Sequence, residues 1–527
     1  MNLPPMRRPR PAAATVLAVV LCAALAGCGG GGGGSDTPAP PAPPMSGPAW
    51  WQFARDVQHS AQGTIATQTL GRILWQTPVD LSPQQRPNGS LLIHYGSPVI
   101  TSQNTVVVPV KTGPGGGFRV DARVGATGTL AWSVSSDYIL PAHDWTPSFN
   151  VALTAANRVY IPGAGGKLFF RDNVDSAATT LQTAVFYGAA AYAAAPALYD
   201  ATIFINTPLT VDAQGNVFFG FVATGANPAG VTGGIARIGV DGSGSWIAAS
   251  KASGDAAISV VSMNSAPALS GDLKTLYVAV ASDPGLGIHP YGYLLALDAV
   301  TLAAKGKTIL NDPATNTPAW VNPNASASPS VGPDGDVYYG VLEANVPAHN
   351  FRGWLLHFDA TLNTAKAPAA FGWDDTASIV PIAMVPSYTG PSSYLLATKY
   401  NNYGGVGTGD GKNRMAILDP NQVQADTISG IPVMKEILTI LGPTPDPNFP
   451  GGVKEWCINT AAVDPVTRSV LVNSEDGILY RWNLATNQLS EQIKLGAPVA
   501  ESYTPTVIGP NGAIYAINSG VLLSVGQ

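Results

Sequence analysis

The chain has 527 residues, of which 46% are hydrophobic and 11% are charged, whereas an average soluble domain is about 25% charged. Glycine (58 residues) and proline (45 residues) are both abundant. This composition lacks the charged outer faces that long amphipathic helices need, and it favours many short strands joined by turns. The apolar content can bury a sizeable core, which excludes disorder for most of the chain.

Residues 1–27 predict a secretory signal peptide. Three arginines, at positions 7, 8 and 10, precede an apolar run from Ala12 to Leu25, and this run is shorter than the roughly 20 residues that a transmembrane helix needs. The run ends in Leu25-Ala26-Gly27-Cys28, which resembles the bacterial lipobox. The resemblance implies cleavage before Cys28, acylation of Cys28 and, with Gly29 after it, transfer to an outer membrane. The alternative is an ordinary signal peptide followed by a chance cysteine.

The processed chain is acidic. Residues 28–527 carry 24 basic and 33 acidic side chains, a net charge of −9. No basic patch stands out, which argues against nucleic acid as a partner. Cys22 leaves with the signal and Cys28 is expected to be acylated, so Cys457 remains alone and an intramolecular disulfide is excluded. An exported chain without a disulfide must rely on its core.

Residues 28–49 predict a tether. Six glycines follow Cys28 and give flexibility, and the proline-rich half that comes next stiffens toward polyproline II. The tether joins the lipid anchor to a third region, residues 50–527.

Residues 50–527 contain an internal repeat. In each copy a small residue, often with proline, precedes a short apolar strand, a turn and a strand rich in valine and aromatic residues, as in Ser328-Pro329-Ser330 followed by Asp336–Gly340. The copies begin near residues 97, 146, 207, 265, 328, 378, 457 and 504. Their spacing exceeds the roughly 40–50 residues of a propeller blade in several cases, so several copies carry insertions.

The repeat predicts an all-β fold, an eight-bladed β-propeller, with a seven-bladed ring in another register as the alternative. Six copies show a third strand, including Gly292–Asp298, Gly353–Asp359, Arg414–Asp419 and Ile478–Asn483. The eighth copy ends with Val521–Val525, one strand short, and Ile73–Thr77 is a strand without partners of its own. We therefore expect this N-terminal strand to complete the last blade and to remove its free edge.

The segment Trp50–Ser60 resembles the opening segment of pyrroloquinoline-quinone-like (quinoprotein-type) propellers. The family's tryptophan-docking motif, Ala-x-Asp-x-x-Thr-Gly-x-x-x-Trp, is matched in part twice. The matching residues are Ala122, Thr127, Gly128 and Trp132 in one copy and Ala236, Gly242 and Trp246 in another. The acidic position is Val124 in the first match. The resemblance implies that Trp132 and Trp246 are structural, each docking between adjacent blades and burying about 150–250 Å².

The family's enzymes hold the quinone between a tryptophan and a disulfide of adjacent cysteines, with calcium bound by Glu, Asn and Asp. A single mature cysteine cannot form that disulfide. Glu455-Trp456-Cys457 places a tryptophan at the start of a blade, but we interpret Trp456 and Cys457 as packing residues. The resemblance thus favours the non-enzymatic branch of the family.

Other chemical signals are weak. The loop Gly404–Asn413 lacks the glycine and hydroxyl positions of a phosphate loop, so it predicts a glycine-rich connection between strands. His143-Asp144-Trp145 could orient an imidazole, and Asp374-Asp375 could bind a cation. We interpret both groups as exposed loop residues. The sequence therefore assigns no catalytic, cofactor-binding or metal-binding residue.

The first functional hypothesis is a lipid-anchored propeller of the cell envelope, in the outer membrane facing the periplasm or the cell surface. It would be a monomer without cofactor that binds a protein or an envelope polymer such as a polysaccharide. The insertions 171–206, 341–352 and 400–412 are the candidate binding loops. The alternative is an envelope oxidoreductase dependent on pyrroloquinoline quinone (PQQ) and calcium. No Asp-box repeat is present, which disfavours a carbohydrate-cleaving propeller.

Overall fold

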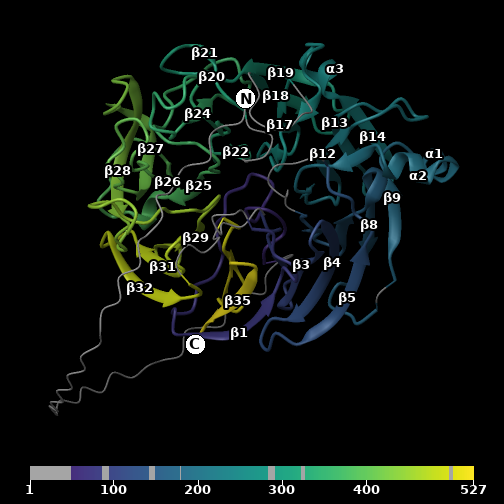
Figure 1. Cartoon of the computed structure of the whole chain (residues 1–527), viewed down its shortest axis with the longest axis horizontal. Helices are drawn as coiled ribbons and strands as arrows, with labels where there is room; N and C mark the ends of the chain where they lie inside the picture. The colour runs from purple at the N-terminus through teal and green to yellow at the C-terminus, as the bar shows by residue number, and fades with distance from the viewer. Residues whose placement is uncertain are drawn as a thin grey trace. The chain divides into compact units, whose positions relative to one another are not determined.

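Eight antiparallel sheets follow one another along the chain and form a ring, as Figure 1 shows. The computed structural model describes residues 49–85, 94–141, 149–178, 180–282, 291–321, 327–497 and 503–527, all within the unit Met45–Gln527. None of the helices in these ranges is long and apolar enough to cross a membrane. The prediction of an eight-bladed β-propeller is confirmed, and the seven-bladed alternative is wrong.

The first four blades are numbered in chain order. Blade 1 contains β2 (Val99–Ile100), β3 (Thr105–Gly113), β4 (Gly116–Val124) and β5 (Leu130–Ser136). Blade 2 contains β6 (Ala152–Leu153), β7 (Val159–Pro162), β8 (Lys167–Arg171) and β9 (Gln182–Val185). Blade 3 contains β10 (Ile203–Ile205), β11 (Thr210–Val211), β12 (Val217–Ala223), β13 (Gly234–Ile238) and β14 (Gly244–Ala248). Blade 4 contains β15 (Val260–Val261), β16 (Ala268–Leu269), β17 (Thr275–Ala281), β18 (Gly292–Asp298) and β19 (Ala304–Ile309).

The other four blades complete the ring. Blade 5 contains β22 (Ser330–Val331), β23 (Val337–Val341) and β24 (Trp354–Phe358). Blade 6 contains β25 (Ser378–Pro381), β26 (Tyr394–Tyr400), β27 (Arg414–Ala425) and β28 (Pro432–Leu441). Blade 7 contains β29 (Ala462–Asp464), β30 (Ser469–Asn473), β31 (Ile478–Asn483) and β32 (Gln488–Lys494). Blade 8 contains β33 (Val507–Ile508), β34 (Ile514–Asn518), β35 (Val521–Gly526) and β1 (Arg72–Pro78).

Short helices, turns and one hairpin lie between the strands of the blades along the chain. The helices are α1 (Ala189–Ala194), α2 (Pro196–Asp200) and α3 (Ala249–Ser253), and the 3-10 turns are η1 (Ala164–Gly166) and η2 (Ile382–Met384). The hairpin of β20 (Asn311–Asp312) and β21 (Thr317–Pro318) stands between blades 4 and 5.

The ring closes as the sequence predicts. Strand β1 pairs antiparallel with β35, from Arg72 opposite Gly526 to Pro78 opposite Val521. The indole of Trp75 in β1 then donates a 2.7 Å hydrogen bond to the Gly125 carbonyl in blade 1. The first strand of the fold thus joins its last blade to its first.

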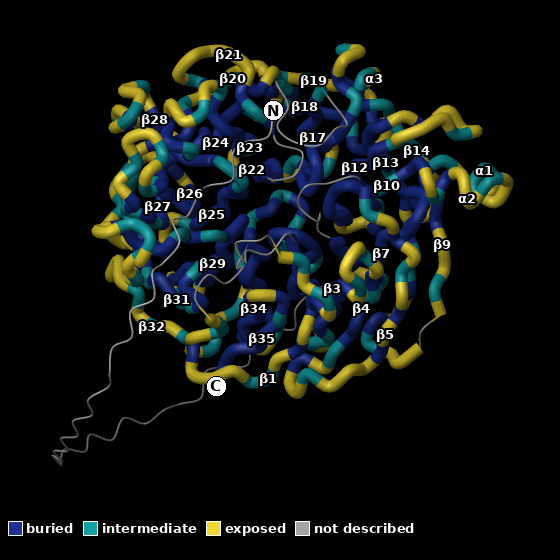
Figure 2. Tube along the Cα trace, viewed as in Figure 1, coloured by how far each residue is buried: buried dark blue, intermediate teal, exposed yellow. Residues whose placement is uncertain are grey.

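Burial within a blade follows strand position. The middle strand β23 is buried along its whole length, whereas the outer strand β32 alternates between half-buried and exposed residues. Neighbouring blades cover both faces of the inner strands, so those strands carry continuous apolar runs, while the outer strands have one face in solvent. Figure 2 shows this gradient, with exposed residues gathered at the rim of the ring.

Residues 50–68, here called the N-terminal belt, pass along the inner strands. The hydrogen bonds of the belt reach the blades in order, joining Trp50 to Ile100, Trp51 to Leu153, Gln52 to Val211, Val57 to Leu269, Gln58 to Val331, Ser60 to Ile379, Ala61 to Val463 and Gln68 to Gly512. In six blades the inner-strand N–H donates to a belt carbonyl. The belt therefore covers the inner edges of the sheets, which would otherwise be open to pairing.

The belt contains several residues with left-handed backbone conformation. Ala54, Arg55, His59 and Ala61 all have positive φ, between 48° and 77°. Such left-handed conformations cost about 1–2 kcal/mol for a residue with a Cβ. The eight blade contacts, together with the complete burial of Trp50, offset that cost.

Candidate functional site at the ring axis

In several blades, the serine or threonine that opens the repeat links the blade to its neighbour near the axis. The hydroxyl of Ser328 in blade 5 accepts from the Ala266 N–H in blade 4 at 2.9 Å. Thr376 in blade 6 accepts likewise from the Ser328 N–H at 2.9 Å. The hydroxyl of Thr504 in blade 8 donates to the Tyr95 carbonyl beside blade 1 at 3.1 Å. The recurring hydroxyl residue of the repeat thus fixes the loops that precede the inner strands.

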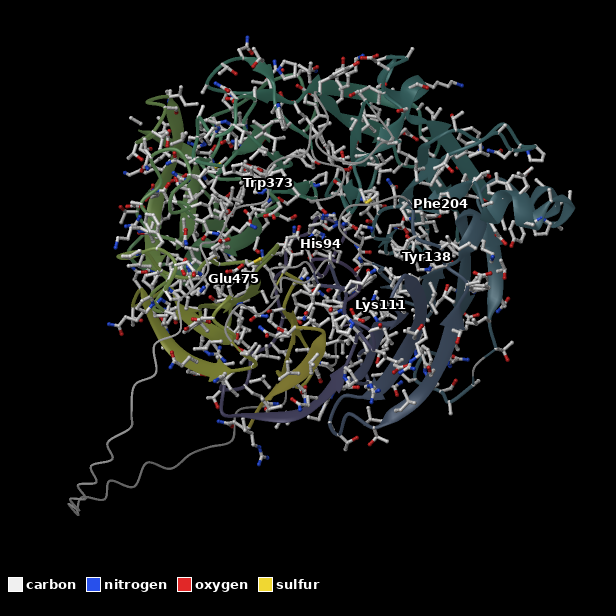
Figure 3. All side chains as sticks on the ribbon, viewed as in Figure 1. His94, Lys111, Tyr138, Phe204, Trp373 and Glu475 are labelled. Carbon is white, nitrogen blue, oxygen red and sulfur yellow. The ribbon has the colours of Figure 1, made fainter. Side chains whose placement is uncertain are left out.

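These loops and strand β26 carry a group of side chains that we call the axis cluster. Its members come from blades 1, 4, 6, 7 and 8 and are His94, Asn264, Asp374, Lys399, Asn459 and Tyr503. His94 lies near the middle of the ring in Figure 3. Its ring stacks on Tyr503, with centroids 4.1 Å apart, and its Nδ1 lies 3.2 Å from the Asn264 amide nitrogen. His94 therefore bridges opposite sides of the ring.

An ion pair occupies the other half of the cluster. The Lys399 ammonium contacts the Asp374 carboxylate, and the two side chains are 2% and 20% exposed. The ammonium also lies 5.8 Å from the centre of the Tyr503 ring. Asn459 donates from its amide to the Tyr503 hydroxyl at 2.9 Å and to the Asp374 carbonyl at 3.1 Å. Hydrogen bonds, a stacked ring pair and an ion pair thus join members of the cluster to one another.

Burial sets the protonation states at the axis. Desolvation, aided by the nearby Lys399 charge, lowers the pKa of His94 to about 3, so His94 is neutral at pH 7 and a weak base. Burial alone would lower the pKa of Lys399, but the neighbouring Asp374, Cys457 and Asp375 raise it overall. Burial raises the pKa of Asp375 to about 7, against the opposing effect of Lys399. Asp375 can therefore exchange a proton near neutral pH.

The structure corrects the interpretation of Asp374-Asp375 as an exposed pair. Asp375 is 1% exposed and accepts the Thr398 hydroxyl, and Asp374 is paired with Lys399. The carboxylates are thus part of the ring interior. Within the described ranges, no three or more His, Cys, Asp and Glu side chains gather closely enough to hold a metal ion.

Trp456 and Cys457 have different surroundings. Trp456 is completely buried in the core between blades 6 and 7, where its ring meets Tyr480 edge-on at 5.5 Å, which confirms packing. Cys457 is half-buried and is not part of a disulfide. It lies close enough to Lys399 to raise the pKa of that ammonium.

The two tryptophans of the docking motif differ in burial. Trp132 in β5 is 3% exposed, donates to the Val174 carbonyl of blade 2 at 2.7 Å and lies under the Arg171 guanidinium. Trp246 in β14 is half-buried, and its ring meets Phe221 of the same blade edge-on at 6.0 Å.

Several predicted features lie outside the described residues. These are the signal peptide, Cys28, the tether up to residue 48 and His143-Asp144-Trp145. The glycine-rich segment Gly404–Asn413 is confirmed as a connection between β26 and β27.

Two of the three predicted binding loops meet. The Asn350 amide donates to Asn402 at 2.9 Å and accepts from the Thr408 N–H at 2.8 Å, which joins the insertions 341–352 and 400–412. The insertion 171–206 instead forms β9 and the α1–α2 pair at the rim (Figure 1). The three insertions therefore do not form one surface.

Sequence reasoning missed His94, Lys399 and Tyr503. Lys399 interrupts the otherwise apolar and hydroxyl-bearing strand Tyr394–Tyr400, and a charge in a fully buried strand is itself a signal. His94 and Tyr503 stand just ahead of the serine or threonine that opens a repeat. Aligning the repeats at that hydroxyl would have placed both side chains at the axis.

No protein-family model matches the sequence, and no curated protein matches it. Solved structures do match in fold. A europium-containing methanol dehydrogenase aligns with a TM-score of 0.54 and 10% identity over 89% of each chain. A quinohemoprotein alcohol dehydrogenase from Comamonas testosteroni aligns with a TM-score of 0.53 and 12% identity over 92% of this chain and 77% of the other.

BamB from Moraxella catarrhalis aligns with a TM-score of 0.43 and 12% identity over 86% of this chain and all of BamB. At these identities the likeness concerns fold alone. In fold, the chain is an eight-bladed propeller like that of the quinoprotein alcohol dehydrogenases.

Proposed function

We propose that this protein is a non-catalytic binding or scaffold propeller of the bacterial cell envelope, attached to the membrane by a lipid on Cys28. Its ligand would be a protein or an envelope polymer, bound without a cofactor. One observation carries the proposal: the chain's own residues occupy the ring axis, with the belt along the inner strands and the axis cluster beside it.

The donors at the axis do not fit the quinone site that the family resemblance implies. The site needs a flat slot between a tryptophan and a disulfide of adjacent cysteines, and the residues on either side of Cys457 are Trp456 and Ile458. Its neighbour Trp456 is completely buried in the core between two blades, so its face is not available to a planar cofactor. We therefore assign no step to a quinone.

Calorimetric titration of the full-length protein in detergent with PQQ and calcium tests the absence of a cofactor site. We expect no saturable heat, while an apo quinoprotein alcohol dehydrogenase in the same buffer gives the positive control. The alternative is an oxidoreductase dependent on PQQ and calcium, and two dehydrogenases share the fold of this chain. Saturable one-to-one binding would establish that alternative and overturn the proposal.

The lipid anchor has its own test. Cells grown with a labelled fatty acid should incorporate the label into the wild-type chain, which should fractionate with the outer membrane. Cys28→Ser removes the acceptor thiol and should abolish both the label and membrane association. Cys457→Ser is the matched control and should leave both unchanged. Membrane association of an unlabelled Cys28→Ser chain would contradict the anchor.

The joined loops 341–352 and 400–412 are our proposed partner surface. Their mutual hydrogen bonds through Asn350 fix a surface in advance, and preformed loops bind with a smaller ordering cost. Crosslinking in intact envelopes with a photoreactive residue at Thr408 should capture a partner. A photoreactive residue at Val466, an exposed turn position in blade 7, provides the control. Equal labelling from both positions would refute this surface.

A further inference from the structure

A pocket of about 770 Å³ lies between blades 4 and 5, apart from the axis cluster. It opens at the turns that follow the inner strands β16 and β22, whereas the cluster residue Asn264 precedes β16. The pocket and the axis cluster therefore lie toward opposite ends of the inner strands. Its volume falls in the range of small-ligand sites, about 300–1,000 Å³.

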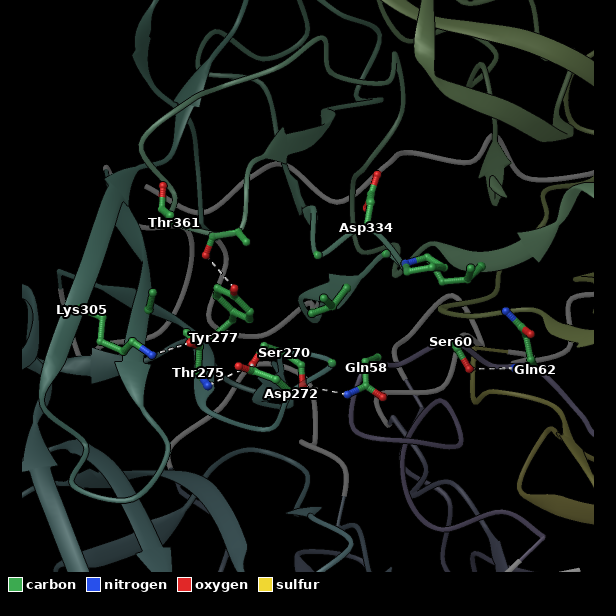
Figure 4. A pocket seen from close by; sticks show the side chains of 18 residues that line it. Gln58, Ser60, Gln62, Ser270, Asp272, Thr275, Tyr277, Lys305, Asp334 and Thr361 are labelled. Atoms are coloured by element: carbon green, nitrogen blue, oxygen red, sulfur yellow. Dashed lines mark hydrogen bonds between the residues drawn. The ribbon is translucent and has the colours of Figure 1, made fainter. Parts of the chain in front are cut away.

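Blade 4, blade 5 and the N-terminal belt build most of its walls (Figure 4), and Ile379 of blade 6 completes them. Blade 4 contributes the turn Ser270–Thr275, and blade 5 contributes Val331–Gly335 and the turn containing Ala360. The N-terminal belt contributes Gln58, Ser60 and Gln62. Because the belt bonds to both inner strands through Val57 and Gln58, this wall is fixed in advance.

The polar side chains are mostly neutral. Seven of the 18 lining residues carry a hydroxyl or a carboxamide, and three are charged: Asp272, Lys305 and Asp334. Lys305 donates to the Thr275 hydroxyl at 2.8 Å. The Oδ1 atom of Asp334 accepts the Tyr394 hydroxyl at 2.8 Å, and no hydrogen bond to Oδ2 is found among the described residues. The Gln62 amide likewise makes no side-chain hydrogen bond within those ranges.

We propose that this pocket binds a neutral, hydroxyl-rich ligand, a short oligosaccharide. Carboxylate and carboxamide groups pair with vicinal hydroxyls by accepting and donating hydrogen bonds. Val331, Ile379 and Ala296 supply apolar wall for the C–H faces of sugar rings. The two carboxylates disfavour an anionic ligand, and Lys305 beside Asp272 offsets part of their attraction for a cation.

A peptide fits less well. Extended peptides commonly bind by adding a strand to an open sheet edge, but the belt already occupies the inner edges of β16 and β22 through Val57 and Gln58. The inference deepens the proposed binding function by naming a ligand class. The quinone titration is independent of it, so failure of either proposal is distinguishable from failure of the other.

The test is titration calorimetry of the full-length protein in detergent with cellotetraose, maltotetraose and the tetramer of N-acetylglucosamine. We expect saturable binding of at least one of them. Ala360→Trp places a bulky side chain at an exposed pocket residue and should weaken binding at least tenfold. Val300→Trp, in the corresponding turn of blade 4 and 67% exposed, should bind like the wild type.

Gln62→Ala removes an unengaged amide and should weaken binding about 2–10-fold, the effect of one net hydrogen bond. Gln182→Ala, an exposed position on β9, is the matched control. An unchanged melting temperature for each variant shows that the fold is retained. Absence of binding to all three oligosaccharides, or wild-type affinity in Ala360→Trp, would overturn the proposal.

Discussion

The N-terminal belt and the axis cluster both fill the centre of the ring, but different interactions hold them in place. The belt is one continuous segment that contacts every blade in chain order, through its backbone in seven blades and through the Gln52 side chain in blade 3. The cluster is assembled from side chains of five blades around the Lys399–Asp374 ion pair. The belt depends on many hydrogen bonds of about 1 kcal/mol each. The cluster depends on a few buried polar groups that are costly when left unpaired.

The largest expected effect comes from removing the belt. A chain that starts at residue 70 keeps β1 but loses all eight blade contacts and the buried Trp50, a loss on the order of 10 kcal/mol. That equals the whole stability of a typical domain. We expect no cooperative thermal transition by calorimetry, whereas a chain that starts at residue 45 should unfold cooperatively. Similar melting of both chains would mean that the blades close without the belt.

Breaking the ion pair is the next largest change. Lys399→Met leaves Asp374 without its cation and should cost about 3–5 kcal/mol in the free energy of unfolding. Lys399→Met with Asp374→Asn removes both charges and should restore most of the loss. Urea denaturation of the wild type and the two variants measures the free energy of unfolding of each. A double variant as unstable as the single one would show that the loss of stability does not come from leaving Asp374 without its cation.

The stability contributions of His94, a member of the axis cluster, and of Asp375, which is next to its member Asp374, should respond to pH in opposite directions. Burial lowers the pKa of His94 from 6.5 to about 3, so the unfolded chain takes up this proton first and stability falls as the pH drops below 6.5. Burial raises the pKa of Asp375 from 3.8 to about 7, so the folded chain takes up this proton first and its contribution to stability grows as the pH falls from 7 to 4.

Urea titrations at pH 7 and pH 5 separate the two groups. The change in unfolding free energy between these pH values should shift by about 2 kcal/mol on substitution of either residue. His94→Gln should make the protein less sensitive to acid, and Asp375→Asn should make it more sensitive. Shifts of the same sign would contradict the assignment.

The smallest expected effect probes one belt contact. The Gln52 side chain is completely buried and accepts the Val211 N–H at 2.6 Å. Gln52→Leu keeps the volume but leaves that N–H without a partner, at a cost of about 1–3 kcal/mol. Gln214→Leu, exposed in the turn after β11, should change stability by less than about 0.5 kcal/mol. Chemical denaturation that ranks the two variants equally would argue against a contribution from this belt bond.

More of the fold than of the candidate site can be predicted from the sequence. The spare strand at Ile73–Thr77 and the incomplete eighth repeat are both local patterns, so ring closure follows from them without any structure. The sequence indicates the belt only through a family resemblance, because the bonds from Trp50 to Ile100 and from Ala61 to Val463 depend on how the ring closes. The Asp374-Asp375 pair was misjudged because Lys399 is 25 residues away in the chain, and no local pattern reveals its partner.

The order of the belt contacts also has a mechanical meaning. Because Trp50, Trp51 and Gln52 bond to blades 1, 2 and 3 in turn, a pull on the chain ahead of Ala49 would load these bonds one after another rather than together. Bonds loaded in series of this kind yield at low force, as in the opening of a zipper. Extraction of the buried Trp50 side chain would give the first resistance. Each further step would then release the belt from one more blade.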